Sequence, residues 1–217
     1  MAGYRGIAVG YPEGMNYAFN AENGALSALW KGEYVTANWR SQGPGDFKPV
    51  GEVIELAQDV GFLHVITNVP QLDLIEHVPK WPLRPVMTKD EPENPDPLYP
   101  KNHGYAFKGY SFGEDGNPTF EYRCGDVMIF DRMQVKEGKL RRTFELVSEK
   151  ETTVFFRALT GKVTKEAEGV FSTGELRLKT GELKVTLRNF GEEKELLIEM
   201  PVSAGKTNYT IDYELLR

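Results

Sequence analysis

A period-2 alternation of apolar and polar residues, repeated about every 8–14 residues from 105 to 216, constrains the fold most. In the clearest case one face carries Tyr209, Ile211, Tyr213 and Leu215, and the other carries Thr210, Asp212 and Glu214. Such alternation is typical of a strand with one buried face. Similar runs, or runs rich in β-branched and aromatic residues, predict strands at 6–10, 127–130, 152–158, 175–179, 182–187 and 194–200.

Pairs of turn-forming residues separate these runs, namely Asn23-Gly24, Asp115-Gly116, Glu137-Gly138 and Thr180-Gly181. Asn-Gly and Asp-Gly supply the positive φ angles that tight hairpin turns require. Only 53–57 and 72–77 fit a short helix, and no longer amphipathic helical pattern occurs. The sequence therefore predicts an all-β fold, an antiparallel β-sandwich of a dozen or more strands.

A proline-rich segment interrupts this rhythm, because eight of the thirteen prolines lie between Pro70 and Pro100. Proline withholds a backbone donor from a sheet and disfavours helix at the residue before it. We predict a long irregular excursion over 70–103, of a length that is usually functional or disordered. Sheets commonly receive strands from both halves of a chain, so we expect a single β-sandwich domain over 1–217.

Composition excludes several classes of function. The 217 residues carry a formal net charge of −6, which disfavours a dedicated nucleic-acid partner. One cysteine excludes a disulfide framework, a cysteine-based zinc site and covalent haem attachment, so we expect no cofactor in this chain. We also expect no membrane span and no signal peptide. Both ends resemble strands, which suits either a module cut from a longer protein or a compact whole one.

The three histidines do not fall at spacings that place two imidazoles on one metal. We interpret His64 and His77 as surface residues. His103 closes the proline-rich segment and is the one candidate for a catalytic acid or base. Cys124 is interpreted as a small buried residue rather than a nucleophile.

The carboxylates mark no acid/base pair. Asp126 and Asp131 lie five residues apart, which on a strand places them on opposite faces and about 16 Å apart. Calcium prefers oxygen ligands, and candidates for such a site are Asp90, Glu91, Glu93 and Asp96. The spacing lacks the glycine and final glutamate of a calcium-binding loop, so we favour a solvated acidic loop over a metal site.

Aromatic residues gather in the N-terminal half, where Trp30 suits either a sugar-stacking surface or a sandwich core. Arg142 shares a strand face with apolar residues, so it should form an ion pair or contact a ligand. The candidate ligand-binding residues are Trp39, Arg40, Trp81, His103, Tyr105 and Arg142.

Two parts of the chain carry a resemblance to a known family. They are residues 19–32, and residues 105–112 with 115–122 and 140–144. Together they resemble a β-sandwich module of large secreted bacterial proteins that also carry c-type cytochrome domains and sugar-dehydrogenase-like propellers. The resemblance implies a periplasmic or extracellular protein and an accessory role beside redox domains. Any electron transfer would then belong to neighbouring domains.

A second resemblance involves residues 102–107, Asn-His-Gly-Tyr-Ala-Phe. They are similar to a motif of sugar epimerases with a galactose-mutarotase-like supersandwich fold, and this likeness implies a role for His103 as acid or base.

We therefore expect a non-catalytic accessory module that binds carbohydrate or docks onto a neighbouring redox domain. The first alternative is a sugar-active enzyme of mutarotase or epimerase type. The second is a structural scaffold, whose partner surface should be an exposed apolar patch.

Overall fold

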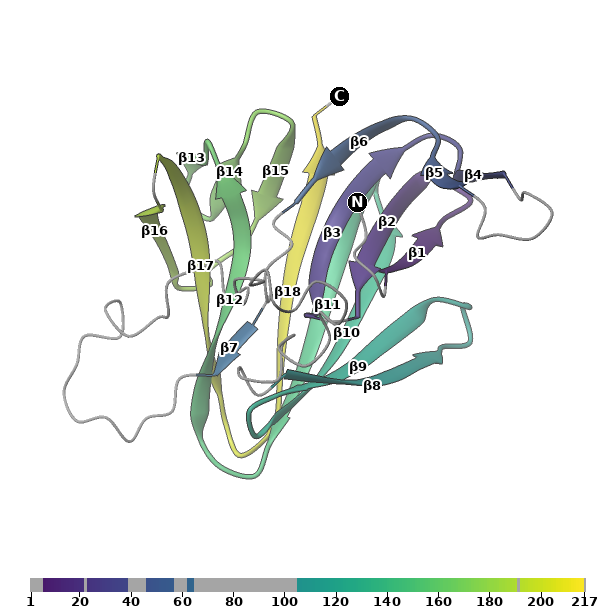
Figure 1. Cartoon of the computed structure of the whole chain (residues 1–217). Helices are drawn as coiled ribbons and strands as arrows, with labels where there is room; N and C mark the ends of the chain where they lie inside the picture. The colour runs from purple at the N-terminus through teal and green to yellow at the C-terminus, as the bar shows by residue number, and fades with distance from the viewer. Residues whose placement is uncertain are drawn as a thin grey trace, which may run out of the picture.

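The computed structural model describes residues 6–21, 23–38, 46–56, 62–64, 105–190 and 192–216. These residues form 18 strands, and all of the described pairings are antiparallel (Figure 1). No helix occurs among them, so the prediction of an all-β fold is confirmed. None of the described segments is therefore a helix long and apolar enough to cross a membrane.

Eight strands form the large sheet. In spatial order they are β13 (Thr164–Ala167), β14 (Val170–Ser172), β15 (Leu176–Lys179), β18 (Gly205–Leu215), β11 (Lys139–Ser148), β10 (Val127–Lys136), β9 (Pro118–Cys124) and β8 (Tyr105–Phe112). Burial alternates along β10 and β11 residue by residue, which is the pattern that the period-2 sequence predicts. One face of this sheet is therefore apolar and the other polar.

Two four-stranded sheets and a short ribbon complete the fold. The β3 sheet contains, in order, β1 (Gly6–Gly10), β2 (Met15–Asn20), β3 (Ala25–Lys31) and β6 (Glu52–Glu55). The β12 sheet contains β16 (Val185–Phe190), β17 (Glu193–Val202), β12 (Thr152–Gly161) and β7 (Phe62–His64). The ribbon pairs β4 (Val35–Asn38) with β5 (Asp46–Pro49).

Both four-stranded sheets pack on the apolar face of the large sheet, which makes the molecule a β-sandwich (Figure 1). From the β3 sheet, Phe19 stacks on Phe120 of β9 with the ring centroids 4.0 Å apart. From the β12 sheet, Phe156 contacts Phe144 of β11 at 5.1 Å. Phe120 and Phe144 both lie opposite Asp131 of β10 in the register, so they point to the same side of the large sheet.

Two neighbouring hairpins carry the chain from one layer to the other. β11 ends at Ser148 and β12 begins at Thr152, while β17 ends at Val202 and β18 begins at Gly205. Because β11 pairs with β18 and β12 with β17, both crossings occur side by side. The β11–β18 pair of the large sheet therefore continues as the β12–β17 pair in the other layer.

The core draws on both halves of the described chain. One cluster of buried apolar side chains includes residues from Tyr11 to Tyr213. Phe62 of β7 is fully buried and contacts the rings of Phe144 and Phe156 at 5.3 and 4.8 Å. Trp30 is also fully buried, in a smaller cluster with Ala18 and Ala28, so it belongs to the core.

The predicted turn pairs are confirmed, because Gly24, Gly116, Gly138 and Gly181 all have φ between 61° and 73°. The structure describes residues 53–56 of the short helix predicted at 53–57, and there the prediction is wrong. Val53 and Ile54 belong to β6 and pair with Trp30 and Leu29 of β3. These β-branched residues gain more from cross-strand packing on a buried sheet than from a one-turn helix.

Candidate functional site

Most of the predicted site residues lie outside the residues that the structure describes. This holds for Trp39, Arg40, Trp81 and His103, for the acidic candidates Asp90, Glu91, Glu93 and Asp96, and for His77 and the segment 70–103. His64 ends the short strand β7. Cys124 is fully buried, as predicted. Of the predicted ligand-binding residues, Tyr105 and Arg142 can be placed.

Arg142 forms a buried ion pair, which is the first of the two roles that the sequence predicts for it; the other is contact with a ligand. Its Nε and Nη2 donate to Oδ1 and Oδ2 of Asp131 at 2.9 and 2.6 Å. Tyr122 donates a further hydrogen bond to Oδ2 at 2.9 Å. With side chains 1% and 0% exposed, Arg142 and Asp131 are out of reach of a ligand in solution. The pair is therefore part of the core.

Tyr105 and Arg142 both bind the backbone of the turn between β2 and β3. The Tyr105 hydroxyl donates to the carbonyl oxygen of Ala21 at 3.2 Å, and Arg142 Nη2 to that of Gly24 at 3.4 Å. Gly24 has a φ of 70°, and a Cβ there would lie 2.8 Å from the Tyr105 ring. The two predicted residues thus attach the β3 sheet to the large sheet.

The buried groups keep the ionisation states that this arrangement needs. Burial raises the pKa of Tyr105 and Tyr122 well above the usual range, so both hydroxyls stay protonated and can donate. Burial alone lowers the pKa of Arg142, but Asp131 outweighs that effect and raises it. The Arg142 guanidinium also lies over the rings of Phe144 and Phe156, at 4.8 and 5.0 Å from their centroids.

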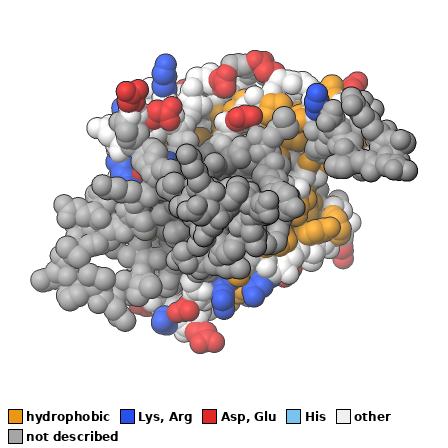
Figure 2. Space-filling model, in the orientation of Figure 1, with side chains coloured by type: hydrophobic (Ala, Val, Ile, Leu, Met, Phe, Trp, Pro, Cys, Tyr) orange, Lys and Arg blue, Asp and Glu red, His pale blue; other side chains and the backbone are white. Residues whose placement is uncertain are grey.

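A different part of the molecule leaves large aromatic side chains in solvent. Tyr110 and Phe112 on β8 are 51% and 66% exposed, more than any other large apolar side chain among the described residues. Their ring centroids are 5.4 Å apart, and the ring planes meet at 82°. Hydrophobic side chains are visible at the right of Figure 2, at the level of the β8–β9 hairpin.

A β-bulge places these rings on the apolar side of the sheet. Phe107 pairs with Tyr122 and Gly109 with Glu121, so Lys108 is the extra residue. The bulge resets the alternation, and Tyr110 then pairs with the core residue Phe120. The Tyr110 and Phe120 centroids are 6.2 Å apart, so the aromatic row continues from the core out to the surface.

Polar side chains surround the turn that follows Phe112. Asp115 accepts hydrogen bonds from the backbone and side-chain nitrogens of Asn117 at 3.2 and 2.7 Å. It also accepts from Arg132 Nη2 at 2.5 Å and from Gln134 Nε2 at 2.9 Å. Desolvation raises the Asp115 pKa, but the bonds from Asn117, Gln134 and Arg132 outweigh it and lower the pKa to about 2.

Gly113 leaves room for this polar group at the turn. A Cβ on Gly113 would lie 2.9 Å from Asp115 Oδ1 and 3.1 Å from Arg132 Nη2. The Arg132 guanidinium therefore lies against the residue next to Phe112. We call the set of Tyr110, Phe112, Asp115, Asn117, Arg132 and Gln134 the hairpin site. Its two parts face opposite ways: Arg132 and Gln134 alternate along β10 with the buried Asp131 and Met133 and so lie on the polar face of the sheet, whereas Tyr110 and Phe112 lie on the apolar side.

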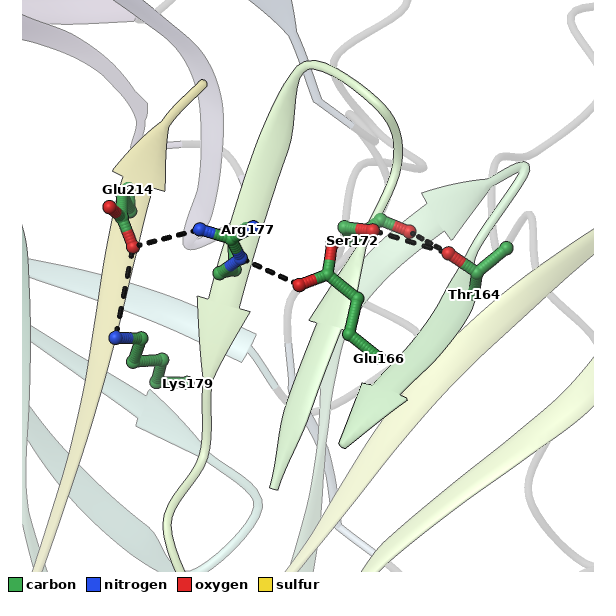
Figure 3. Close-up of polar contacts among 6 residues, drawn as sticks. All are labelled: Thr164, Glu166, Ser172, Arg177, Lys179 and Glu214. Carbon is green, nitrogen blue, oxygen red and sulfur yellow. Dashed lines mark hydrogen bonds and ion pairs between the residues drawn. The ribbon is translucent and has the colours of Figure 1, made fainter. Parts of the chain in front are cut away.

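A second polar cluster, at the other end of the large sheet, neutralises its own charges (Figure 3). Arg177 of β15 donates to Glu166 at 2.7 Å and to Glu214 at 3.5 Å. The hydrogen bond lowers the pKa of Glu166 and raises that of Arg177. Lys179 lies 3.8 Å from Glu214. This ladder joins β13, β15 and β18, and we assign it to the cohesion of the sheet.

A shallow hollow of about 250 Å³ lies between the two layers, away from the hairpin. It is lined by residues of β3, β6 and β18 and by Gly32, which follows β3; these include Lys31, Glu52, Ile54 and Leu215. Across the described ranges, no three His, Cys, Asp or Glu side chains are grouped so that they could hold a metal ion.

Sequence reasoning missed the hairpin site, although a signal for it exists. Apolar residues at 105, 107, 110 and 112 switch from a spacing of two to three and back, which marks a bulge.

No protein-family model matches the chain, and no curated protein is similar to it in sequence.

Proposed function

We propose that this chain is a non-catalytic accessory module of an extracytoplasmic multidomain protein and that it binds carbohydrate at the hairpin site. The observation that carries the proposal is the exposure of Tyr110 and Phe112, at 51% and 66%, on a strand anchored to the core. Exposed aromatic rings offer apolar faces on which the C–H groups of a sugar ring can stack. The extracytoplasmic setting rests on the sequence resemblance.

The chemistry of the hairpin site favours binding over catalysis. A general acid or base works best when its pKa is near the working pH. The Asp115 pKa is lowered to about 2, and the carboxylate already accepts four hydrogen bonds. It is therefore ionised at neutral pH and occupied. A mutarotase-type reaction would depend on His103, which lies outside the described residues.

Calorimetry with a panel of soluble oligosaccharides tests the proposal. We expect the wild-type chain to bind at least one glycan, and Tyr110→Ala or Phe112→Ala to weaken that binding about tenfold, or about 1.4 kcal/mol. Leu216→Ala is the matched control, because Leu216 is 37% exposed and follows β18, which β11, β10 and β9 separate from β8 in the large sheet. The proposal fails if no glycan binds or if both aromatic variants bind like the wild type.

A second candidate, docking onto a neighbouring redox domain, is favoured by the position of β8. Among the described strands, β8 pairs on one side only, with β9. An open edge can accept a strand from a partner. Hydrogen exchange tests this candidate, because the amides of 109–112 should exchange more slowly in a longer natural protein than in this chain alone. Equal exchange would exclude strand addition at β8.

A further inference from the structure

The two edges of the large sheet differ in how they are protected against pairing with another chain. β13 forms one edge, and all of its residues are exposed, with Lys165 and Glu166 both in ion pairs. Short, charged edge strands of this kind discourage the addition of a further strand. Among the described strands, β8 forms the other edge, and its last residues, 109–112, carry no charge. Of these two edges, β8 is therefore the one open to a partner.

The hydrogen bonds of the β8–β9 hairpin show which backbone groups of β8 face outward. The Gly113 N–H donates to the carbonyl oxygen of Asn117 at 3.2 Å. In an antiparallel pair, hydrogen-bonded and non-hydrogen-bonded residues alternate, so Ser111 bonds to β9 and its two neighbours do not. The proline opposite Phe112 has no N–H to donate, which agrees with this alternation. The N–H and C=O groups of Tyr110 and Phe112 therefore point away from β9.

We infer that a second copy of this chain adds to this edge, with the two β8 strands antiparallel about a two-fold axis at Ser111. Tyr110 then lies opposite Phe112 of the second copy, and both have the outward groups that a hydrogen-bonded pair needs. Such a pair exchanges two backbone hydrogen bonds, and the symmetry repeats the pair. A shift by one residue would set outward groups against inward ones. The inference goes beyond the proposed function and does not depend on it.

The side chains also fit this register. Residues opposite each other in an antiparallel pair share a face, so Tyr110 and Phe112 of both copies lie together on the apolar side of the sheet. Beyond them, the register brings Lys108 toward Glu114 of the second copy, and both side chains are exposed. The segment is thus complementary to itself in backbone, apolar surface and charge. This favours a second copy over a neighbouring domain as the occupant of the edge.

The dimer should be weak, because a stable interface buries about 800 Å² on each partner and the paired segment is short. We expect a dissociation constant of about 10–100 µM. Dependence on the chain's own concentration distinguishes a second copy from a strand of another domain.

Sedimentation of the whole chain from about 1 µM to about 1 mM tests the dimer. We expect monomers at the low end of this range and dimers at the high end. Phe112→Pro removes an outward donor and should abolish the dimer, whereas Leu216→Ala should associate like the wild type. A chain that stays monomeric throughout, or a Phe112→Pro variant that dimerises like the wild type, would overturn the inference.

A cysteine at the two-fold axis tests the register. Ser111 meets Ser111 of the second copy as a non-hydrogen-bonded pair, with Cα atoms about 4.5 Å apart, within the range of a disulfide. Ser111→Cys should therefore form an intermolecular disulfide on mild oxidation, while the native Cys124 is fully buried. Thr210→Cys is the matched control, because Thr210 is exposed in the same cross-strand row but lies on β18, within the sheet. Cross-linking of Ser111→Cys no faster than that of Thr210→Cys would refute the two-fold pairing.

Charge reversal gives a further readout. Lys108→Glu should weaken the dimer about threefold to tenfold, because it sets like charges together on both sides of the axis. Lys108→Glu combined with Glu114→Lys should restore the association of the wild type. A double variant that dimerises as weakly as Lys108→Glu alone would contradict the antiparallel register.

Discussion

The Arg142 guanidinium lies between the two layers of the sandwich, bonded to Asp131 and covered by the rings of Phe144 and Phe156. Taking both charges out of water is costly, and their mutual attraction offsets that cost only while both partners are present. Tyr122 satisfies a further acceptor site on Asp131. This group therefore tolerates the loss of one member poorly.

Arg142→Met should lower the free energy of unfolding by about 3–5 kcal/mol, because it leaves Asp131 buried without its counter-charge. Asp131→Leu should be similarly destabilising, and the double variant should lose less than the sum of the two. Urea unfolding measures all three. Asp126→Asn is the control, because its pair with Lys150 is 68% exposed on both sides and should contribute under about 1 kcal/mol. Additive losses would show that the pair is not coupled.

The Asp115 carboxyl should titrate with a pKa of about 2, below its ordinary value of 3.8. A lowered pKa in the folded state means that this group stabilises the fold above about pH 4 and loses that contribution as pH falls through about 2. NMR titration of the carboxyl carbon measures the pKa directly. Arg132→Gln should shift the Asp115 pKa back toward 3.8. An ordinary pKa in the wild type would contradict the hydrogen-bonded turn.

At the level of elements, the turn of the β10–β11 hairpin contains one residue, Glu137, that is unfavourable in the conformation that it adopts. Glu137 and Gly138 have φ values of 54° and 73°, a conformation that asparagine and glycine adopt more readily than glutamate. Glu137→Asn should therefore raise stability by about 0.5–1 kcal/mol in thermal unfolding. Gly138→Ala should lower it by about 1 kcal/mol through backbone strain, since a Cβ there meets nothing within 4 Å. A stabilising Gly138→Ala would refute this turn geometry.

Local pattern predicted the strands well, because each strand's alternation reflects its own burial. The predicted strand at 194–200 lies within β17, and that at 152–158 lies within β12. The strand predicted at 182–187 begins later, at Val185, because Leu183 is hydrogen-bonded to Thr180 in the preceding turn. The pairing of β7 with β12 could not be predicted, since it joins segments about ninety residues apart. Long-range pairing depends on the packing of the whole core.

For the molecule as a whole, apolar spacing reveals the sandwich but not its exposed site. The sequence shows Arg142 as a cation on an apolar strand face. It does not identify the partner, because Asp131 lies on a neighbouring strand. Tyr110 and Phe112 have the spacing of core residues, and only the end of the sandwich at β8 leaves them exposed. A sequence pattern cannot show where the covering layer stops.

Because the hairpin site lies outside the core, its loss should leave the fold intact. Tyr110→Ala and Phe112→Ala should each change the free energy of unfolding by less than about 1 kcal/mol, since both side chains are more than half exposed. Chemical denaturation of the two variants checks this. A loss as large as that of a core aromatic, about 3–5 kcal/mol, would make the pair structural rather than ligand-binding.

The most direct test of carbohydrate binding at the hairpin site is an amide NMR titration with the best-binding soluble oligosaccharide. The largest shift changes should occur at 109–113 and 115–117, and they should vanish in Tyr110→Ala. Changes centred on the hollow at Lys31, Ile54 and Leu215, or no changes at all, would contradict the assignment of the hairpin as the binding site.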